Sequence, residues 1–321
     1  MLAIRIHETG GPERLVTEAV PEPAPRDGQV RVKVAAIGVN FVEVYHRQGL
    51  YSLPRPFTPG AEFAGTVDVV GPGVSGFKPG DRVATANGLG GYAEYALAPV
   101  EKLVVLPGSL SFETAAALML QGLTAHYLAT STWALKPGDT ALVHAAAGGV
   151  GLLLIQIAHR RGARVVGTAS TAEKATLARA AGADHVVLYS QTDFVAEAER
   201  LLGPKAFDVV YDSVGKTTFE KGLGLLKPRG LMVLFGQSSG PVEPVSPQVL
   251  SRMGSLYLTR PTLGDYVATR QELLTRTTDL LAWVGEGLDV RVDKTFPLAA
   301  AADAHRYLES RASMGKILLV P

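Results

Sequence analysis

The stretch that decides the fold is Thr140-Ala-Leu-Val-His-Ala-Ala-Ala-Gly-Gly-Val-Gly-Leu-Leu-Leu-Ile-Gln-Ile-Ala158. It begins with the apolar, β-prone run Ala141–His144, passes through the small residues Ala145–Gly149, and continues as the helix-compatible segment Gly151–Arg161. The turn contains Ala146-x-Gly148-x-x-Gly151, the dinucleotide-binding fingerprint with alanine at the first glycine position. Small residues let the backbone approach a pyrophosphate, and a helix N-terminus offers N–H groups and partial positive charge. The stretch therefore predicts a strand, a phosphate-binding turn and a helix.

Composition narrows the possible functions. The chain has 321 residues, of which 47% are hydrophobic, and its net charge is +1. This length allows two domains with large cores, and the charge predicts neither nucleic acid nor a membrane as the main partner. The chain has no cysteine, which excludes disulfides, zinc–thiolate sites and thiol catalysis. The N-terminal run Met1–His7 alternates like a strand and lacks the apolar centre of a signal peptide, so we expect a soluble cytoplasmic protein.

The first part of the chain is rich in short β-prone runs separated by Pro/Gly turns, which predicts a barrel-like β domain. Two helices are expected after it, at Phe112–Leu120 and Leu123–Ser131. The expected strands are Met1–His7, Glu13–Val20, Gln29–Ile37, Ala61–Val70, Asp81–Thr85 and Gly91–Ala98.

The second part alternates strands with helices, a rhythm typical of crossover units in a parallel sheet. Six strands with the fingerprint on the first predict a doubly wound nucleotide-binding domain. After Ala141–His144, the expected strands are Arg164–Ala169, His185–Tyr189, Phe207–Tyr211, Leu231–Phe235 and Ser255–Leu258. The expected helices between them are Ala172–Ala181, Asp193–Leu202 and Thr217–Leu226.

The C-terminal part departs from this alternation, with a long expected helix at Asp265–Glu286 and strands at Arg291–Phe296 and Lys316–Val320 around a helix at Ala299–Glu309. We expect it to return to the first domain. The predicted boundaries are 1–122 with 262–321 for a catalytic domain and 123–261 for a nucleotide-binding domain, with the active site in the cleft between them.

Several motifs give the chain a resemblance to a known family. They include Val39-Asn-Phe41, Pro59-Gly-Ala-Glu-Phe-Ala-Gly65, Gly80-Asp-Arg-Val83, Tyr211-Asp-Ser-Val-Gly215 and Phe235-Gly-Gln-Ser-Ser-Gly240. In order and spacing they resemble the medium-chain dehydrogenase/reductase superfamily, and most closely its zinc-free quinone oxidoreductases related to zeta-crystallin. The resemblance implies an α/β protein with a GroES-like β-barrel domain and a Rossmann-type, doubly wound six-stranded parallel sheet.

The resemblance also bears on metal binding. At the positions of the zinc ligands in the alcohol dehydrogenase branch, this chain has Asn40, Ala61 and, near the third ligand, Gln121. Neither a Cys₂His nor a His₂Glu set survives these replacements, so no metal site is expected.

The residues after the second strand bear on the choice of nicotinamide cofactor. An NAD site usually places a carboxylate about twenty residues beyond the fingerprint, but Val166–Ser170 contains none. Ser170 and Glu173 are expected to form a capping box, which puts Lys174 in the first turn of the next helix. A cation is poorly placed there unless an anion such as a 2′-phosphate binds nearby. The resemblance places Lys174 and Tyr189 around the 2′-phosphate of NADPH, which is therefore predicted over NADH; alternatively, Lys174 is only a solvated surface lysine.

Without a metal, the hydride acceptor must stabilise developing charge itself, which a quinone or an enone does by conjugation. The chemistry and the resemblance together assign Asn40 to orient either the acceptor oxygen or the nicotinamide ribose. Tyr45 is expected either to donate a hydrogen bond or proton, or only to shape the pocket, and Tyr51 and Gln121 to line the substrate. Arg260 and Arg311 are expected to contact phosphate or an interface, or to be solvated. Further cofactor contacts are expected at Phe41, Thr124, Ala147, Gly148, Gly149, Val150, Gly151, Ser213, Val214, Phe235, Gly236, Ser238 and Ser239.

Three functions remain open at this point. The first is an NADPH-dependent quinone oxidoreductase, and the second is an enoyl or alkenal reductase with the same cofactor. The third is a non-catalytic NADPH-binding protein, either crystallin-like or RNA-binding. The near-neutral net charge argues against the RNA-binding hypothesis. A homodimer is expected through the edge strand near Ser251–Pro261.

Overall fold

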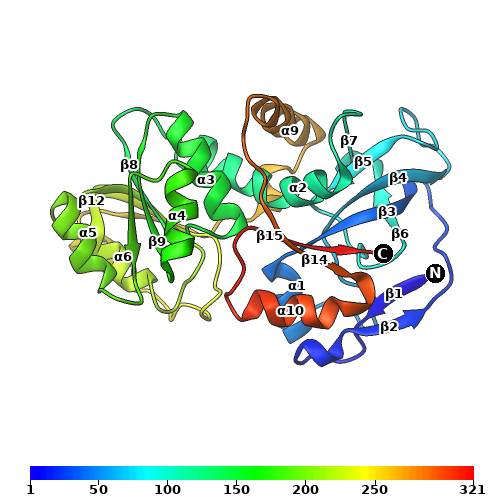
Figure 1. The fold of residues 1–321 in the computed structure, drawn as a ribbon, viewed down its shortest axis with the longest axis horizontal. Helices are drawn as coiled ribbons and strands as arrows, with labels where there is room; N and C mark the ends of the chain where they lie inside the picture. The colour runs from blue at the N-terminus through cyan, green and yellow to red at the C-terminus, as the bar shows by residue number, and fades with distance from the viewer. The chain divides into compact units, whose positions relative to one another are not determined.

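The computed structural model describes residues 1–321, which fold into two compact units (Figure 1). The first unit contains Met1–Leu123, Val267–Ala282 and Val290–Pro321. The second contains Thr124–Tyr266 and Trp283–Asp289. The predicted α/β class is confirmed, because the second unit combines a parallel sheet with helices and the first is built mainly of antiparallel strands.

The second unit is organised around the strand that leads into the fingerprint. Its six strands lie in the order β10-β9-β8-β11-β12-β13, and every neighbouring pair is parallel. The chain runs in opposite directions across the sheet on the two sides of β8, so the switch point where such sheets bind ligands lies between β8 and β11. The strands are β8 (Thr140–Val143), β9 (Arg164–Ala169), β10 (His185–Leu188), β11 (Phe207–Asp212), β12 (Leu226–Leu234) and β13 (Tyr257–Thr259).

Helices cover both faces of this sheet. Helix α3 contacts α4, α5 contacts α6, and Figure 1 shows the two pairs on opposite sides of the strands. Beneath α5 and α6, the rings of Phe194 and Phe219 belong to one buried apolar cluster with Leu142, Val166 and Val210 from the strands. Burial on both faces explains why these strands are almost continuously apolar. The helices are α3 (Gly149–Arg160), α4 (Ala172–Ala180), α5 (Phe194–Leu202), α6 (Phe219–Leu225), α7 (Pro247–Arg252) and α8 (Leu263–Tyr266).

The first unit is built on the long strand β3, which pairs antiparallel with β4, β6 and the C-terminal strand β15. The sheet order is β14-β15-β3-β4-β5-β7, with β6 paired to β3, and β1 and β2 form a separate pair. The strands are β1 (Leu2–Arg5), β2 (Val16–Ala19), β3 (Gln29–Val39), β4 (Glu62–Val70), β5 (Arg82–Thr85), β6 (Tyr95–Pro99), β7 (Val104–Val105), β14 (Val292–Pro297) and β15 (Lys316–Val320). The larger helices that contribute to this unit are α1 (Phe41–Gln48), α2 (Phe112–Tyr127), α9 (Arg270–Gly285) and α10 (Ala301–Glu309).

Two predicted helix boundaries are wrong. The two helices expected at 112–120 and 123–131 are one continuous helix, α2, followed by a π-helical turn at Leu128–Thr132. Gly122, between the two expected helices, lies inside α2, where a Cβ would be 2.7 Å from Leu118 Cδ1 and 3.3 Å from Leu280 Cδ1. The glycine therefore permits close packing and does not end the helix.

The long helix expected at 265–286 is also wrong, because it is divided into α8 and α9. Thr269 and Glu272 form a reciprocal cap at the start of α9: Thr269 N donates to Glu272 Oε2 over 3.0 Å, and Glu272 N donates to Thr269 Oγ1 over 3.2 Å. Helices α1 and α7 and the short strand β7 were not predicted at all.

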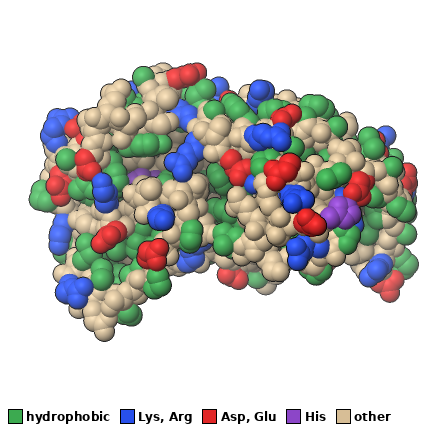
Figure 2. All heavy atoms as spheres, turned by 90° about the horizontal axis from the view of Figure 1, so that it is seen from below, with side chains coloured by type: hydrophobic (Ala, Val, Ile, Leu, Met, Phe, Trp, Pro, Cys, Tyr) green, Lys and Arg blue, Asp and Glu red, His purple; other side chains and the backbone are tan.

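The surface mixes charges of both signs. On the face drawn in Figure 2, Lys and Arg side chains are interspersed with Asp and Glu, in keeping with a net charge of +1. None of the helices is both long enough and apolar enough to cross a membrane.

Candidate active site

The phosphate-binding turn has the geometry that the fingerprint predicts. The turn bends at Ala145, which has a φ of 52°, and Gly148 N donates to Ala145 O over 2.9 Å. A Cβ on Gly151 would lie 2.4 Å from Ala145 O and 2.8 Å from Ala146 O, so no other residue fits there. Helix α3 starts at Gly149, and its N-cap, Gly148, has no side chain to occupy the first N–H groups. Backbone N–H groups at a helix start without a side-chain cap are suited to binding an anion, and these lie at the carboxyl end of β8.

The segment after β9 shows that the expected capping box is wrong but that Lys174 lies, as expected, in the first turn of the next helix. The N-cap of α4 is Thr171, whose side chain accepts from Lys174 N over 3.3 Å, so the expected Ser170–Glu173 capping box is wrong. Ser170 instead accepts a hydrogen bond at its carbonyl from Ser190 Oγ over 2.6 Å, which joins this loop to the one that carries the exposed Tyr189. Lys174 remains in the first turn of α4 and is half-buried. The segment thus brings Ser170, Lys174 and Tyr189 to one end of the sheet.

The loops after β11 and β12 are held together by a buried carboxylate. Asp212 Oδ1 accepts from Val214 N over 2.7 Å and from Gly215 N over 2.9 Å. Across to the next loop, Ser239 N donates to Val214 O over 2.8 Å. A Cβ on Gly236 would be 2.6 Å from the carbonyl oxygen of the first loop, so the two backbones lie in direct contact. The expected cofactor residues brought together here are Ser213, Val214, Phe235, Gly236, Ser238 and Ser239.

His144, next to the fingerprint, is a buried residue. Its Nδ1 lies 3.0 Å from Thr168 Oγ1 on β9, and its ring meets Phe194 edge-on at 5.1 Å. Burial lowers the pKa of His144, so the imidazole is neutral at pH 7 although Asp212 opposes the shift. The geometry is that of a structural link between neighbouring strands.

In the first unit, helix α1 and the loop after it carry Tyr45 and Tyr51, two of the residues expected at the substrate. Tyr45 is 8% exposed, and its ring meets that of Tyr51 edge-on at 5.4 Å. Tyr51 N donates to Tyr45 O over 3.2 Å, so the loop after α1 folds back over the helix end. The ring centroids of Phe41 and Tyr45 are 6.2 Å apart, and Phe41 packs against the hydrophobic core of the first unit. Phe41, Tyr45 and Tyr51 therefore form one aromatic group, of which Tyr51 is the exposed member.

Asn40, the N-cap of α1, sits in a buried polar network that joins four segments of the first unit. Lys316 Nζ donates to Asn40 Oδ1 over 2.6 Å and to Glu62 Oε2 over 2.5 Å. Glu62 Oε1 accepts from Leu120 N in α2 over 2.6 Å. All three side chains are at least 90% buried. The network fixes the start of α1 against β4, β15 and α2.

A second carboxylate, Glu43, lies beneath the start of α1. It accepts from Asn40 N over 2.8 Å and from Ala61 N over 2.9 Å. Burial raises the pKa of Glu43 to about 7, against the lowering effects of the two backbone N–H groups and of Lys316. The carboxyl group therefore changes its charge near neutral pH.

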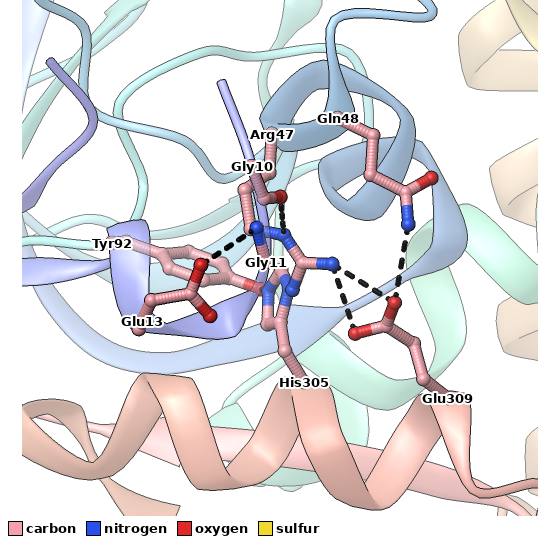
Figure 3. Close-up of polar contacts among 8 residues, drawn as sticks. All are labelled: Gly10, Gly11, Glu13, Arg47, Gln48, Tyr92, His305 and Glu309. Carbon is pink, nitrogen blue, oxygen red and sulfur yellow. Dashed lines mark hydrogen bonds and ion pairs between the residues drawn. The ribbon is translucent and has the colours of Figure 1, made fainter. Parts of the chain in front are cut away.

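The other end of α1 is clamped by a buried arginine, as Figure 3 shows. Arg47 is fully buried and donates through Nη2 to both carboxylate oxygens of Glu309, over 2.9 and 3.0 Å. Its Nε donates to Gly10 O over 3.1 Å, and its Nη1 lies 3.2 Å from His305 Nδ1. Because arginine only donates, His305 Nδ1 is the acceptor, and Nε2–H faces the Tyr92 hydroxyl at 3.1 Å. The clamp joins α1, α10 and the N-terminal loop.

Because His305 is part of this clamp, we expect the stability of the fold to decrease at acid pH. Burial and the positive charge of Arg47 lower the pKa of His305 from its usual 6.5 to about 3. Between these values an unfolded chain binds a proton that the folded chain does not, so this contribution is complete above pH 6.5 and is lost as the pH falls towards 3. In His305→Asn, Oδ1 can still accept from Arg47 but nothing titrates. The free energy of unfolding of the wild type minus that of the variant is therefore expected to decrease as the pH is lowered from 6.5 to 3, by up to about 1.4 kcal/mol for each pH unit. Urea unfolding across the pH range measures it, and a pH-independent difference contradicts it.

The remaining expected residues lie at several places. Gln121 lies on α2 in the first unit, and Thr124, on the same helix, is a buried residue of the second. Arg260 follows β13 and is exposed. Arg311 is exposed in the loop after α10, with a φ of 59°. Ala147 and Val150 lie in the fingerprint turn and at the start of α3.

Sequence reasoning missed the buried charges. A signal was present for some of them: Asn40-x-x-Glu43 has the spacing of a capping box, and Lys316 opens an otherwise apolar strand. Arg47 and His305 gave no such signal, because their hydrogen bond forms only once α10 packs beside α1.

No metal site is apparent among the side chains, since no three His, Asp or Glu residues are placed together to hold an ion. At Asn40, where the resemblance puts a zinc ligand, the side-chain oxygen already contacts the ammonium group of Lys316. A second cation there would be repelled by the first, so this position does not fit a metal.

Known families match both parts of the chain. Residues 26–108 match the alcohol dehydrogenase GroES-like domain, and residues 149–283 match the family described as zinc-binding dehydrogenase. The predicted pairing of a GroES-like with a Rossmann-type unit is thereby confirmed. The fold and the fingerprint define the class of the protein as a medium-chain dehydrogenase/reductase.

Similarity to individual proteins extends over the whole chain. "Quinone oxidoreductase 1" of Escherichia coli strain K12 is 44% identical over 99% of both chains, and a "2-haloacrylate reductase" of a Burkholderia species is 43% identical over 100% of this chain and 99% of the other. A solved structure of Escherichia coli quinone oxidoreductase complexed with NADPH is 44% identical, covers 100% of both chains and has a TM-score of 0.98. The chain belongs to the quinone oxidoreductase family of the medium-chain dehydrogenase/reductases.

Proposed function

We propose that this protein is an NADPH-dependent quinone oxidoreductase that transfers hydride directly to a quinone or another conjugated carbonyl compound without a metal. The observation that carries the proposal is full-length similarity, at 44% identity, to a quinone oxidoreductase solved with NADPH. The fingerprint turn of this chain supports it independently, since only glycine fits at position 151 and the first N–H groups of α3 carry no side-chain cap.

The residues at the end of β9 fit NADPH better than NADH. The strand and the loop after it, Arg164–Ser170, offer no carboxylate to a ribose hydroxyl, and Lys174 lies in the first turn of α4. A helix N-terminus and a cation together attract a phosphate. We assign Ser170, Lys174 and Tyr189 to the 2′-phosphate.

The remaining steps are assigned to residues of this chain. When bound, NADPH supplies a hydride, which together with one proton from solvent reduces a quinone to a hydroquinone. Asp212 holds together the loops after β11 and β12, which lie at the carboxyl edge of the sheet, and we assign the residues of these loops to the cofactor. The Tyr45 hydroxyl is the donor that we assign to the acceptor oxygen, with Tyr51 and Gln121 as walls for the substrate.

Reduction of an activated alkene is the second candidate function. It is favoured by the similarity, at 43% identity, to a protein named for 2-haloacrylate reduction. Values of kcat/KM for a naphthoquinone, an enone and 2-chloroacrylate, measured with NADPH, decide between the two functions. The first proposal expects the naphthoquinone to be the best of the three. A higher value for either alkene favours the second, and NADPH binding without turnover of any of them favours a non-catalytic protein.

We further propose that the protein acts in the cytoplasm as a homodimer that pairs through β13. This strand is the edge of the six-stranded sheet, and its Tyr257 and Leu258 are 59% and 37% exposed. Unpaired edge strands with exposed apolar side chains favour pairing with a second copy. Light scattering is expected to give twice the chain mass for the wild type and the chain mass for Leu258→Lys. A monomeric wild type, or a dimeric variant at micromolar concentration, contradicts this.

A further inference from the structure

The end of helix α1 joins the two tyrosines that are expected at the substrate. The carbonyl oxygen of Tyr45 accepts from Leu50 N over 2.9 Å and from Tyr51 N over 3.2 Å. The chain reverses at Gly49, the C-cap of α1, whose φ of 79° is left-handed and suits glycine. This reversal brings the ring of Tyr51 against that of Tyr45, with the centroids 5.4 Å apart. The position of Tyr51 therefore depends on how the last turn of α1 is held.

Two segments that are distant in the sequence hold this last turn (Figure 3). In the N-terminal loop, Gly10 N donates to Arg47 O over 3.0 Å, and Arg47 Nε donates back to Gly10 O over 3.1 Å. On α10, the carboxylate of Glu309 accepts from Arg47 Nη2 over 2.9 and 3.0 Å and from Gln48 Nε2 over 3.3 Å. Both the backbone and the side chains of the turn are thus fixed to parts of the first unit outside α1.

The loop that follows α1 is exposed. Residues 48–52 are all exposed, and the next buried residue along the chain is Phe57. A Cβ on Gly49 would be 2.9 Å from Thr9 Cγ2, so the N-terminal loop also lies directly against the reversal. Exposed loops are among the least stable parts of a fold, and their position follows that of the elements that anchor them. A change in the last turn of α1 is therefore expected to move Tyr51.

The chemistry of the clamp favours geometry over stability as its role. A buried ion pair can often be replaced by apolar residues without loss of stability, because the desolvation of two charges offsets their attraction. Apolar residues do not reproduce its direction, since the guanidinium group is a rigid planar fork whose bidentate contact with a carboxylate fixes orientation as well as distance. The contact between Arg47 and Glu309 thus sets how the last turn of α1 is oriented on α10.

We propose that Arg47 and Glu309 are positioning residues that hold Tyr51 against Tyr45 and thereby set the affinity for the quinone or enone. The inference rests on the proposed function, in which both tyrosines belong to the substrate site. Arg47 is fully buried, so it acts on the substrate through the loop and not by contact. When the clamp is removed, the substrate loses an aromatic wall, which raises KM, while the hydride transfer itself, and with it kcat, is unchanged.

Steady-state kinetics of Arg47→Met/Glu309→Gln test this. The double variant removes both charges together, so no buried charge is stranded and much of the stability lost in Glu309→Gln alone is expected to return. The KM for a naphthoquinone at saturating NADPH is expected to rise roughly three- to tenfold in the single and the double variant, the value of one aromatic contact. The kcat and the Kd of NADPH are expected to stay within about twofold. A double variant that regains both the stability and the KM of the wild type overturns the positioning role.

Two further measurements show whether the effect passes through the loop. The Leu50 and Tyr51 amides, which donate to Tyr45 O, are expected to exchange hydrogen roughly fivefold faster in the double variant. In a Tyr51→Ala background the wall is already missing, so the same double substitution is expected to raise KM no further. Unchanged exchange at these amides, or an equal rise in KM with and without Tyr51, overturns the proposed route.

Two additional variants complete the experiment. Asp303→Asn, in the exposed pair with Arg306 on α10, is the matched control and leaves KM unchanged. Glu309→Asp keeps the charge but withdraws the carboxylate by one methylene, so it carries the test if the double variant does not fold: its KM is expected to rise, and an unchanged KM overturns the inference. A wild type that reduces neither the naphthoquinone nor an enone contradicts the proposed function itself, whereas turnover with a KM that no clamp variant alters overturns this inference alone.

Discussion

Replacing Lys174 with alanine is expected to weaken NADPH binding by roughly 10- to 150-fold, the value of a charged hydrogen bond of about 1.5–3 kcal/mol. NADH binding is expected to change by no more than about twofold, because NADH has no 2′-phosphate for the lysine to contact. Lys174 lies in the first turn of α4 beside the Thr171 cap, and on our proposal its charge and the helix N-terminus act together on the 2′-phosphate. Fluorescence titration of both cofactors against wild type and variant measures the effect.

Arg179 provides the control for the Lys174 experiment. It lies in the last turn of the same helix and is exposed, so Arg179→Ala removes the same charge from the opposite end of α4. No change in the Kd of either cofactor is expected in this variant. An equal loss of both cofactors in Lys174→Ala, or no loss of NADPH, contradicts the assignment of Lys174 to the 2′-phosphate.

Replacing Glu309 with glutamine is expected to lower the free energy of unfolding by about 3–5 kcal/mol, the cost of leaving one partner of a buried ion pair uncompensated. The cause is Arg47, which is fully buried and pairs with both carboxylate oxygens of Glu309. Its other partners, the Gly10 carbonyl and His305, are neutral at pH 7, since burial and Arg47 hold the pKa of His305 at about 3. In the variant the buried guanidinium thus loses the only carboxylate with which it forms a direct ion pair, and only the exposed Glu13 acts on its charge from further away. Urea unfolding at pH 7 measures the loss.

An exposed pair on the same helix is the control for Glu309→Gln. Asp303 lies 2.6 Å from Arg306, but the two side chains are 64% and 54% exposed. Asp303→Asn is therefore expected to cost less than about 1 kcal/mol. Similar losses from the two substitutions would show that the buried clamp contributes no more than a surface pair.

Local sequence determines the second unit closely. The fingerprint turn requires Gly151 because the backbone oxygens of Ala145 and Ala146 leave no room for a Cβ, and this requirement is visible as a spacing of small residues. The six strands are apolar because both faces of the sheet are covered, so each could be recognised from a short run of residues. All six predicted parallel strands are present in the structure.

Helix ends were predicted less well, because neighbouring residues compete for the same role. Ser170 and Thr171 are both good N-caps, and Glu173 favoured the first of them by spacing, yet the structure uses Thr171. Gly122 has the composition of a helix end but lies inside α2, since its role is to let α2 and Leu280 approach each other. Such choices depend on packing partners that sequence spacing does not contain.

The buried charges were the least predictable part of the site. Lys316 and Glu62 are 254 residues apart in sequence, and Arg47 and His305 are 258 apart. Each contact exists only after the C-terminal segment has joined the first unit, as β15 beside β3 and as α10 beside α1. Lys316 begins an apolar strand and Glu62 lies in a β-prone run, so the sequence indicates that each buried charge needs a partner of opposite charge. It does not indicate which residue that partner is.

The measurement that tests the central claim most directly is NADPH oxidation by chelator-treated protein in the presence of a naphthoquinone, with the metal content of the same sample determined by mass spectrometry. The proposed mechanism predicts that one hydroquinone forms for each NADPH oxidised and that the rate equals that of untreated protein at substoichiometric zinc. Activity that is lost on chelation and restored by stoichiometric zinc would contradict a metal-free hydride transfer.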